Sequence, residues 1–335
     1  MEASRYKSII SRVTVLLAVL SLSGCKFALL DPAGDVGVQI KELILTSLFL
    51  MLIVVVPVIL MTIFFVYKYR ESNTQQKEYA PDWSHSNKIE FVVWTVPIII
   101  IVILAVITWR STHHLEPSNP LVSDEETMTI EVVSLDWKWL FIYPEENIAT
   151  VNYVAFPKDV PVKFKITSDN IMNSFFIPRL GSQIYAMPGM VTRLHLISRE
   201  ARDYRGIAAS YSGEGFSDMK FTATALESRA AFKQWVEEVK HKSDAKVMTS
   251  FDDYRELAKP SIADPVSYYS SVPKDLFSSV VTQFPGGMVH GHGIGMDEAM
   301  TSHGDMAGHG EMGAMKTHAS MEAESEHAGH ATADH

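Results

Sequence analysis

The sequence has very few cysteines and comparatively few charges. One cysteine among 335 residues excludes a disulfide framework, an all-cysteine zinc site and a dithiol redox pair. The 29 basic residues are outnumbered by 39 acidic ones, for a net charge of −10. This balance excludes a nucleic-acid-binding protein, because such proteins need a basic surface. Charged residues make up only 20% of the chain and hydrophobic residues 47%, which predicts a membrane protein.

The single cysteine follows a predicted export signal, residues 1–24. Basic residues precede an apolar stretch at 13–22 that is too short to span a membrane. The stretch ends in Leu22-Ser23-Gly24-Cys25, which resembles a bacterial lipobox. In such signals the cysteine is acylated and becomes the mature N-terminus, so we predict lipidation of Cys25. The alternative is a buried structural cysteine.

Two apolar runs predict membrane-spanning helices at 43–67 and 90–109. Glu90 is the only charged residue in either run, and each run is about long enough to cross the ~30 Å hydrocarbon layer. Basic residues lie at both ends of the loop 68–89, whereas acidic residues follow the second run. The positive-inside rule therefore places this loop in the cytoplasm. Residues 25–42 and everything after 109 are then periplasmic, in a bacterial inner membrane.

From residue 127 onward the pattern changes to the alternation typical of β-strands. Alternating segments occur at 127–133, 160–166 and 191–197, with turn-forming residues between them. Short strands at this spacing predict an all-β sandwich or Greek-key barrel within residues 110–226. Residues 227–285 begin with an apolar stripe at helical spacing, which predicts a helical arm.

Three distinctive segments follow one another along this topology. They are residues 86–98, the aromatic run 136–144 that begins Asp136-Trp137-Lys138-Trp139, and residues 208–221. Over about residues 25–285 the chain resembles subunit II of the haem-copper terminal oxidases. The three segments match its second membrane helix, the opening of its cupredoxin domain and its copper-binding loop. The resemblance implies a membrane α-helical hairpin plus an all-β, cupredoxin-like (Greek-key) periplasmic domain, with a short helical arm.

The copper-binding loop departs from the family pattern. Members that accept electrons from cytochrome c bind two copper ions through Cys-x-Glu-x-Cys-Gly-x-x-His-x-x-Met and one earlier histidine. We match this pattern through Gly213, Ser217 and Met219. The degenerate copper-site positions are then Asn173, Ala208, Ser210, Ser212 and Phe216, with only Met219 retained. Bridging copper needs thiolates, so we predict no metal in the cupredoxin domain.

This pattern of loss is similar to the quinol-oxidising members, the cytochrome bo type. The resemblance implies a subunit of a proton-pumping quinol oxidase, which transfers electrons from quinol to O2 and forms water. This subunit would bind no cofactor and contribute no catalytic residue. The haems and copper would belong to a haem-copper catalytic subunit I, with smaller membrane subunits beside it. The alternatives are a cytochrome c oxidase subunit II and a membrane-anchored periplasmic copper chaperone.

The aromatic run suggests a contact surface. The odd spacing of Trp137, Trp139, Phe141 and Tyr143 places them on one face of a strand. They could form an electron path or a packed cluster. In a domain without a metal, we predict that Trp137, Trp139 and Tyr143 pack against the catalytic subunit.

Glu90 lies at the cytoplasmic start of the second predicted span. One interpretation is a solvated carboxylate that is favoured by the helix dipole. The other, implied by the resemblance, is the mouth of a proton-uptake path in the catalytic subunit.

The tail 286–335 has a different composition from the rest of the chain. It contains no aromatic residue but eight of the 13 histidines and seven of the 16 methionines. Because it has so little to bury, we predict disorder. Imidazole and thioether groups suit copper, and the candidate ligands are His290, His292, His303 and His309. The tail is either a solubilising segment or a copper-collecting one, the latter being the working part of the chaperone alternative.

Overall fold

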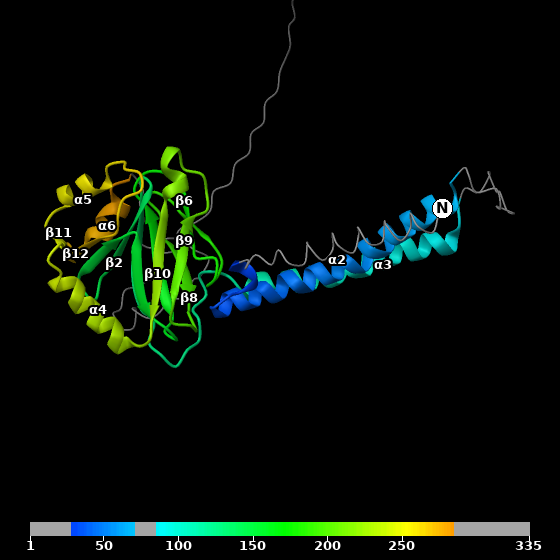
Figure 1. Cartoon of the computed structure of the whole chain (residues 1–335), viewed down its shortest axis with the longest axis horizontal. Coiled ribbons are helices and arrows are strands. Elements are labelled where there is room, and N and C mark those ends of the chain that lie inside the picture. The colour runs from blue at the N-terminus through cyan, green and yellow to red at the C-terminus, as the bar shows by residue number, and fades with distance from the viewer. Residues whose placement is uncertain (1–27, 71–84, 285–335) are drawn as a thin grey trace, which may run out of the picture. The chain divides into compact units, whose positions relative to one another are not determined.

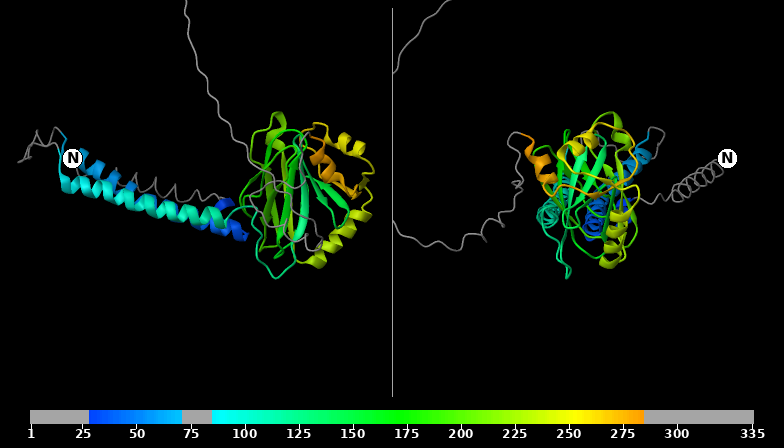
Figure 2. Two further views of the ribbon diagram at one scale, coloured as in Figure 1. Left: turned by 180° about the vertical axis from the view of Figure 1, so that it is seen from behind. Right: turned by 90° about the vertical axis from the view of Figure 1, so that its left-hand side faces the viewer.

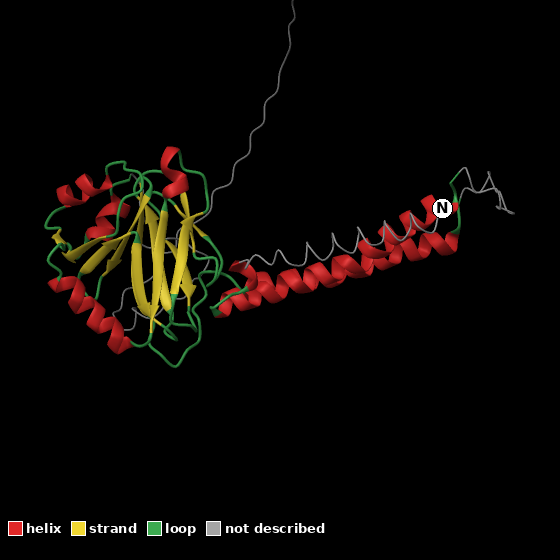
Figure 3. Ribbon diagram, in the orientation of Figure 1, coloured by secondary structure: helices red, strands yellow, loops and turns green. Residues whose placement is uncertain are grey.

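The computed structural model describes residues 28–70 and 85–284. The predicted signal peptide, Cys25 and the tail lie outside the described residues. Within them, the chain contains two long helices, a domain of two β-sheets, and shorter helices packed on that domain (Figures 1 and 3). The predicted fold class, a helical hairpin plus an all-β domain with a short helical arm, is therefore confirmed.

The two long helices are α2 (Asp35–Lys68) and α3 (Asn87–His114), which run side by side (Figure 2). Both are long and apolar enough to cross a membrane. Each contains a proline, Pro57 or Pro97, which membrane helices tolerate because neighbouring groups satisfy the freed carbonyl. Both helices extend beyond the predicted apolar runs. The additional turns carry polar side chains and lie at the end of the hairpin that leads into the β-domain.

The β-domain consists of two mixed sheets. The seven-stranded sheet has the order β11 (Lys246–Val247), β12 (Ser267–Ser271), β3 (Ile148–Val151), β2 (Lys138–Tyr143), β1 (Met128–Leu135), β5 (Val162–Ser168) and β8 (Thr192–Leu196). The five-stranded sheet has the order β4 (Tyr153–Pro157), β10 (Lys220–Leu226), β9 (Asp203–Ala208), β6 (Asn173–Phe176) and β7 (Ile184–Ala186). β1 pairs with β5 in parallel, as β10 does with β4. The three strands predicted from alternation are confirmed as β1, β5 and β8.

The central strand β2 of the seven-stranded sheet is buried on both faces. Trp139, Phe141 and Tyr143 of β2 point into the core between the two sheets. Leu140 and Ile142 of the same strand belong to a second cluster, which includes residues of α5 (Phe251–Ala258) and α6 (Leu276–Thr282). In Figure 1 these two helices lie beside β11 and β12. The domain therefore has three layers, namely the small sheet, the large sheet and the arm.

The predicted helical arm contains strands as well as helices. Its first helix, α4 (Arg229–His241), begins after Ser228, whose side chain accepts a hydrogen bond from Ala231 N (3.2 Å). The apolar stripe of α4 buries Phe232 and Val236 against the β-domain. β11 and β12 then extend the large sheet, with β12 antiparallel to β3. The arm is thus an integral part of the sandwich.

The segment that precedes α2 packs on the β-domain. Ala33 N donates a hydrogen bond to Arg179 O (2.8 Å). A Cβ atom on Gly34 would lie 2.6 Å from two backbone carbonyl oxygens of the β-domain, so only glycine permits this approach. Arg199 holds both carboxylate oxygens of Asp35, at 2.8 and 2.6 Å. These contacts join the first helix directly to the β-domain.

Candidate functional site

The positions that match the copper ligands gather at one end of the five-stranded sheet. β6 and β9 are antiparallel, with Phe175 opposite Ala208. Ala208 N donates a hydrogen bond to Met219 O (3.1 Å), immediately before β10. Asn173 is the first residue of β6. These pairings place Asn173, Ala208 and Met219 at the same end of strands β6, β9 and β10, which we call the Asn173 end.

Asn173 occupies the position of the earlier histidine ligand. Its side chain is 1% exposed, and Nδ2 donates to Ser134 Oγ (2.7 Å) and to Ile171 O (3.3 Å). Its Oδ1 has no hydrogen-bond partner among the described residues. The amide therefore serves as a donor that joins β6 to the end of β1.

The loop after β9 fills the Asn173 end with its own side chains. Ser212 and Met219 are 4% and 1% exposed. Phe216, in the single turn η2 (Glu214–Asp218), packs against the core and meets the ring of Tyr211 edge-on at 5.7 Å. Ser210 lies in the same loop and is half-buried. Serine hydroxyls and hydrocarbon thus occupy the ligand positions of the loop.

Trp137 closes this end of the domain. It lies in the two-residue turn between β1 and β2, where its φ of +66° is unusual for a residue with a side chain. Its Nε1 donates to Ser212 O (3.0 Å). Gly213 and Gly215 make room for the indole, because a Cβ on Gly215 would lie 2.5 Å from the ring. The copper-like loop and the aromatic turn therefore form one packed unit.

The structure corrects the interpretation of the aromatic run. Trp139 and Tyr143 are 0% exposed, so these two side chains cannot contact another subunit. Both belong to the chain's own core, where Tyr143 Oη accepts from Ala155 N (2.8 Å). Trp137 lies outside β2 and so does not share its face, contrary to the prediction. It is half-buried, and its contact with a partner stays a prediction.

The donor set at the Asn173 end does not fit a dinuclear copper centre. Thiolates and imidazoles are the ligands that such a centre requires. Asparagine, alanine, serine and phenylalanine supply neither, and the thioether of Met219 is a weak ligand on its own. Elsewhere in residues 28–70 and 85–284, no group of three or more His, Cys, Asp or Glu residues is arranged to hold a metal ion.

The remaining predicted site residues are dispersed. Glu90 is exposed in the first turn of α3, away from the β-domain in sequence and at the opposite end of that helix. Cys25 and the four tail histidines, His290, His292, His303 and His309, lie outside the described residues. Their predicted roles stay predictions.

A buried lysine, Lys138, also joins the sheet to the arm and is not predicted from the sequence. Lys138 is 3% exposed, and its Nζ forms an ion pair with Asp264 (3.0 Å) and donates to Lys259 O (2.9 Å) and Ser261 Oγ. Burial raises the pKa of the Asp264 carboxyl, but hydrogen bonds from Ser261 and Lys138 outweigh burial and hold that pKa below its ordinary value. These contacts tie β2 to the arm. The available signal was a single charge within an apolar strand, since buried charges are normally paired.

Apolar side chains are exposed around the Asn173 end. They are Ile171 (43%), Met172 (46%), Tyr185 (48%), Met190 (46%) and Tyr211 (79%). Ile171 and Met172 directly precede β6, and Tyr211 lies in the loop after β9. Asn173 pairs with Ala186, the last residue of β7, which places the residues after β7 at the Asn173 end as well. We call these five side chains the apolar loop surface. Exposed apolar groups that gather in this way are typical of protein–protein contacts.

Comparison with known proteins follows the same division of the chain. The family model described as the periplasmic domain of cytochrome c oxidase subunit II matches residues 144–226. The model described as the COX aromatic rich motif matches residues 245–288, most of the arm. A crystal structure of the periplasmic domain of subunit II of cytochrome oxidase from Bradyrhizobium japonicum is 19% identical, with a TM-score of 0.34, over 37% of this chain and 99% of that one.

Full-length relatives are much more similar. The chain is 54% identical over 295 residues to cytochrome bo(3) ubiquinol oxidase subunit 2 of Pseudomonas aeruginosa, covering 86% of this chain and 88% of the relative. It is 51% identical over 282 residues to ubiquinol oxidase subunit 2 of Acetobacter aceti, covering 84% and 90%. The resemblance predicted from the sequence is thereby confirmed. The chain belongs to the ubiquinol oxidase subunit 2 family of the haem-copper oxidases.

Proposed function

We propose that this chain is subunit II of a proton-pumping ubiquinol oxidase and that its own role is assembly and subunit contact. The observation that carries the proposal is the donor set at the Asn173 end, in a chain of the ubiquinol oxidase subunit 2 family. A subunit that receives electrons from cytochrome c needs a copper relay there. A quinol dissolved in the membrane delivers its electrons elsewhere in the complex, so the relay has no task.

In this proposal the haems and copper belong to a larger catalytic subunit, and this chain binds no cofactor. The catalytic subunit oxidises quinol and reduces O2 to water. The residues of this chain hold the two sheets and the arm as one rigid body next to the two membrane helices. Glu90 would lie at the mouth of a proton-uptake path of the catalytic subunit. Cys25 would carry a lipid that anchors the mature N-terminus at the periplasmic face of the inner membrane.

The apolar loop surface, together with Trp137, is the proposed contact with the rest of the complex. The five side chains of this surface are apolar and exposed. Tyr211→Ser and Met172→Ser should each reduce recovery of the intact complex, because apolar contact area is lost. Val247→Ser is the matched control, since Val247 is 57% exposed but lies on β11 in the other sheet. Equal recovery of all three variants would contradict this contact.

One purification tests the proposed function as a whole. The tagged chain, isolated from membranes in mild detergent, should bring down a haem-containing partner, and the complex should consume O2 with ubiquinol. Oxidation of reduced cytochrome c in place of ubiquinol would overturn the proposal in favour of a cytochrome c oxidase subunit. Isolation without any haem-containing partner would favour the copper chaperone.

The lipid anchor has its own test. Mass spectrometry of the purified chain should find Cys25 as the N-terminal residue with lipid attached, and Cys25→Ser should block this processing. The variant should stay in the membrane, because α2 and α3 also anchor it. An intact Met1 in the wild-type complex would exclude lipidation of Cys25.

A further inference from the structure

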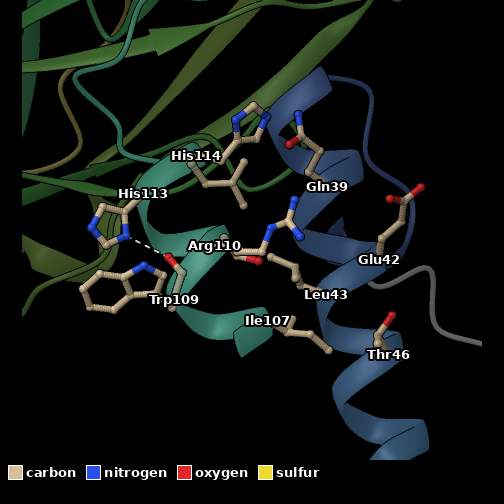
Figure 4. Close-up of a pocket in the computed structure, with 11 residues that line it drawn as sticks. Gln39, Glu42, Leu43, Thr46, Ile107, Trp109, Arg110, His113 and His114 are labelled. Carbon is tan, nitrogen blue, oxygen red and sulfur yellow. Dashed lines mark hydrogen bonds between the residues drawn. The ribbon is translucent and has the colours of Figure 1, made fainter. Parts of the chain in front are cut away.

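An open pocket of about 860 Å³, which we call the cavity, lies in the groove between α2 and α3, at the end of the hairpin that leads into the β-domain (Figure 4). Its walls combine polar and apolar side chains in two separate zones. Gln39, Glu42 and Arg110 line one zone, and Leu43, Thr46 and Ile107 line the other. The volume lies within the ~300–1,000 Å³ of typical ligand pockets.

The cavity lies at the border of the charge-free part of both helices. In α2 the last charge before the apolar run is Glu42, and in α3 the first charge after it is Arg110. Trp109, which also lines the cavity, contacts His113 in a tilted arrangement with ring centroids 4.5 Å apart. Tryptophan is enriched where a membrane meets water. One zone of the cavity therefore lies at headgroup depth, and the other lies at the start of the hydrocarbon.

Two exposed residues of opposite charge, Glu42 and Arg110, line the rim of this open pocket. Within the described part of the chain, neither Glu42 nor Arg110 forms a hydrogen bond or an ion pair through its side chain. In Figure 4, Arg110 extends from α3 toward α2, and Glu42 and Gln39 project from α2. A charge at the edge of the hydrocarbon is costly unless it is paired or hydrated. A ligand with both a positive and a negative group would satisfy the two residues together.

We propose that this cavity binds one phosphatidylethanolamine molecule. Its phosphate would accept charge-assisted hydrogen bonds from Arg110. Its ammonium group would donate to the Glu42 carboxylate and to the Gln39 amide oxygen. Its acyl chains would leave along Leu43, Thr46 and Ile107 into the bilayer. The lipid would then link the two helices at the point where they meet the β-domain.

The lining also predicts which lipids are excluded. A phosphatidylglycerol headgroup carries only negative charge and would place no cation near Glu42. A phosphatidylcholine headgroup carries a quaternary ammonium, which has no N–H to donate to Glu42 or Gln39. The cavity should therefore prefer phosphatidylethanolamine to both.

Native mass spectrometry of the intact purified complex tests the proposal. After detergent washing, the wild-type complex should retain one phosphatidylethanolamine that Arg110→Gln and Glu42→Gln complexes lose, because each substitution should raise the Kd for this lipid about tenfold, the equivalent of about 1.4 kcal/mol. Lys41→Gln is the matched control, because Lys41 is on the same turn of α2 but does not line the cavity. It should retain the lipid. The haem spectrum of each complex confirms that it has assembled.

Add-back to the delipidated wild-type complex tests the same site without a variant. Phosphatidylethanolamine should rebind, and equimolar phosphatidylglycerol or phosphatidylcholine should not displace it. Retention of phosphatidylethanolamine by both cavity variants would overturn the proposal. So would equal binding of the three lipids, a quinone retained in its place, or no retained lipid in the wild-type complex.

Discussion

At the scale of single residues, the contact between Trp137 and Gly215 decides the shape of the Asn173 end. The tryptophan adopts a left-handed backbone conformation, which is unfavourable by about 1–2 kcal/mol for a residue with a Cβ. The hydrogen bond from its Nε1 to Ser212 O (3.0 Å) holds it there. The absence of a side chain at Gly215 leaves space for its ring. The loop and the turn therefore stabilise each other.

Gly215→Ala should destabilise the domain by about 1–3 kcal/mol, the usual effect of overpacking. The new methyl group would overlap the indole, whose nearest ring atoms would lie 2.5 Å away. Denaturant unfolding of a recombinant fragment 112–285, which contains both sheets, measures the loss. Ser217→Ala, at an exposed position of the same turn η2, is the control and should leave stability unchanged. An unchanged midpoint for Gly215→Ala would show that the indole is not held in this position.

His195 gives the same domain a pH dependence. The residue is 5% exposed on β8, and burial lowers the pKa of its imidazole, although a hydrogen bond with Pro117 O (3.3 Å) opposes this. Lys163 and Arg193 lower the pKa further. The unfolded chain therefore takes up a proton near pH 6.5, the ordinary value, while the folded domain stays neutral to lower pH. The contribution of His195 to the unfolding free energy is therefore constant above pH 6.5 and decreases as the pH falls from 6.5 toward the lowered pKa of the folded state.

The expected slope is at most about 1.4 kcal/mol per pH unit below pH 6.5, the effect of one proton. His195→Gln should flatten this slope in the unfolding free energy of the fragment. His241→Gln, which changes an imidazole that is 82% exposed, should not. Identical pH profiles for wild type and His195→Gln would contradict the assignment.

The residue types at the candidate site can be read from the sequence, whereas the packing of those residues cannot. Whether a side chain can supply a thiolate or an imidazole depends on its residue type alone. Ala208, Ser212 and Phe216 can therefore be recognised without any coordinates as residues that supply neither. The conformation of Trp137 depends on Ser212 and Gly215, which lie far away in the chain. No local pattern reports such a contact. The same holds for Trp139 and Tyr143, since alternation shows that they share a face but not which partner covers it.

Among the helices and strands, the helical hairpin and the strands whose burial alternates along part of their length could be predicted. The arm could be predicted only in part. β1, β5 and β8 alternate along at least part of their length, which made them recognisable. β2 is buried along its whole length because arm helices cover its second face. β11 and β12 are short and depend on β3 for their pairing, so their own residues carry little strand signal. The sequence pattern of the arm therefore predicts helix and gives no indication of these two strands.

Lys138→Met tests how strongly the arm is held to the large sheet. The substitution keeps the length of the side chain but removes the contacts with Asp264, Lys259 and Ser261. Removing one partner of a buried ion pair typically destabilises by about 3–5 kcal/mol. Because Asp264 is 28% exposed, we expect a value at or below the lower end. Lys233→Met, at an exposed lysine of α4, should have no such effect.

Limited proteolysis locates this effect. In Lys138→Met the arm should become cleavable near residues 259–264 at protease concentrations that leave the wild-type fragment and the Lys233→Met fragment intact. Equal protection of all three fragments would show that the arm is held by the apolar contacts of α5 and α6 alone.

At the level of the whole molecule, the chain combines two apolar helices long enough to cross a membrane with a β-domain whose Asn173 end is packed by its own side chains. The segment before α2 packs directly on the β-domain, through Ala33, Gly34 and the pairing of Asp35 with Arg199. The arm closes the other side of the large sheet. The large sheet and its partner are therefore fixed at two places, by the segment at the start of α2 and by the arm.

Electron paramagnetic resonance of the oxidised, purified complex can show whether this subunit holds a dinuclear copper centre. We expect the oxidised complex to show no signal from a mixed-valence copper pair. We also expect no copper to be bound to this chain once it is separated from its partners. A mixed-valence dinuclear copper signal that is lost with this subunit would contradict the account.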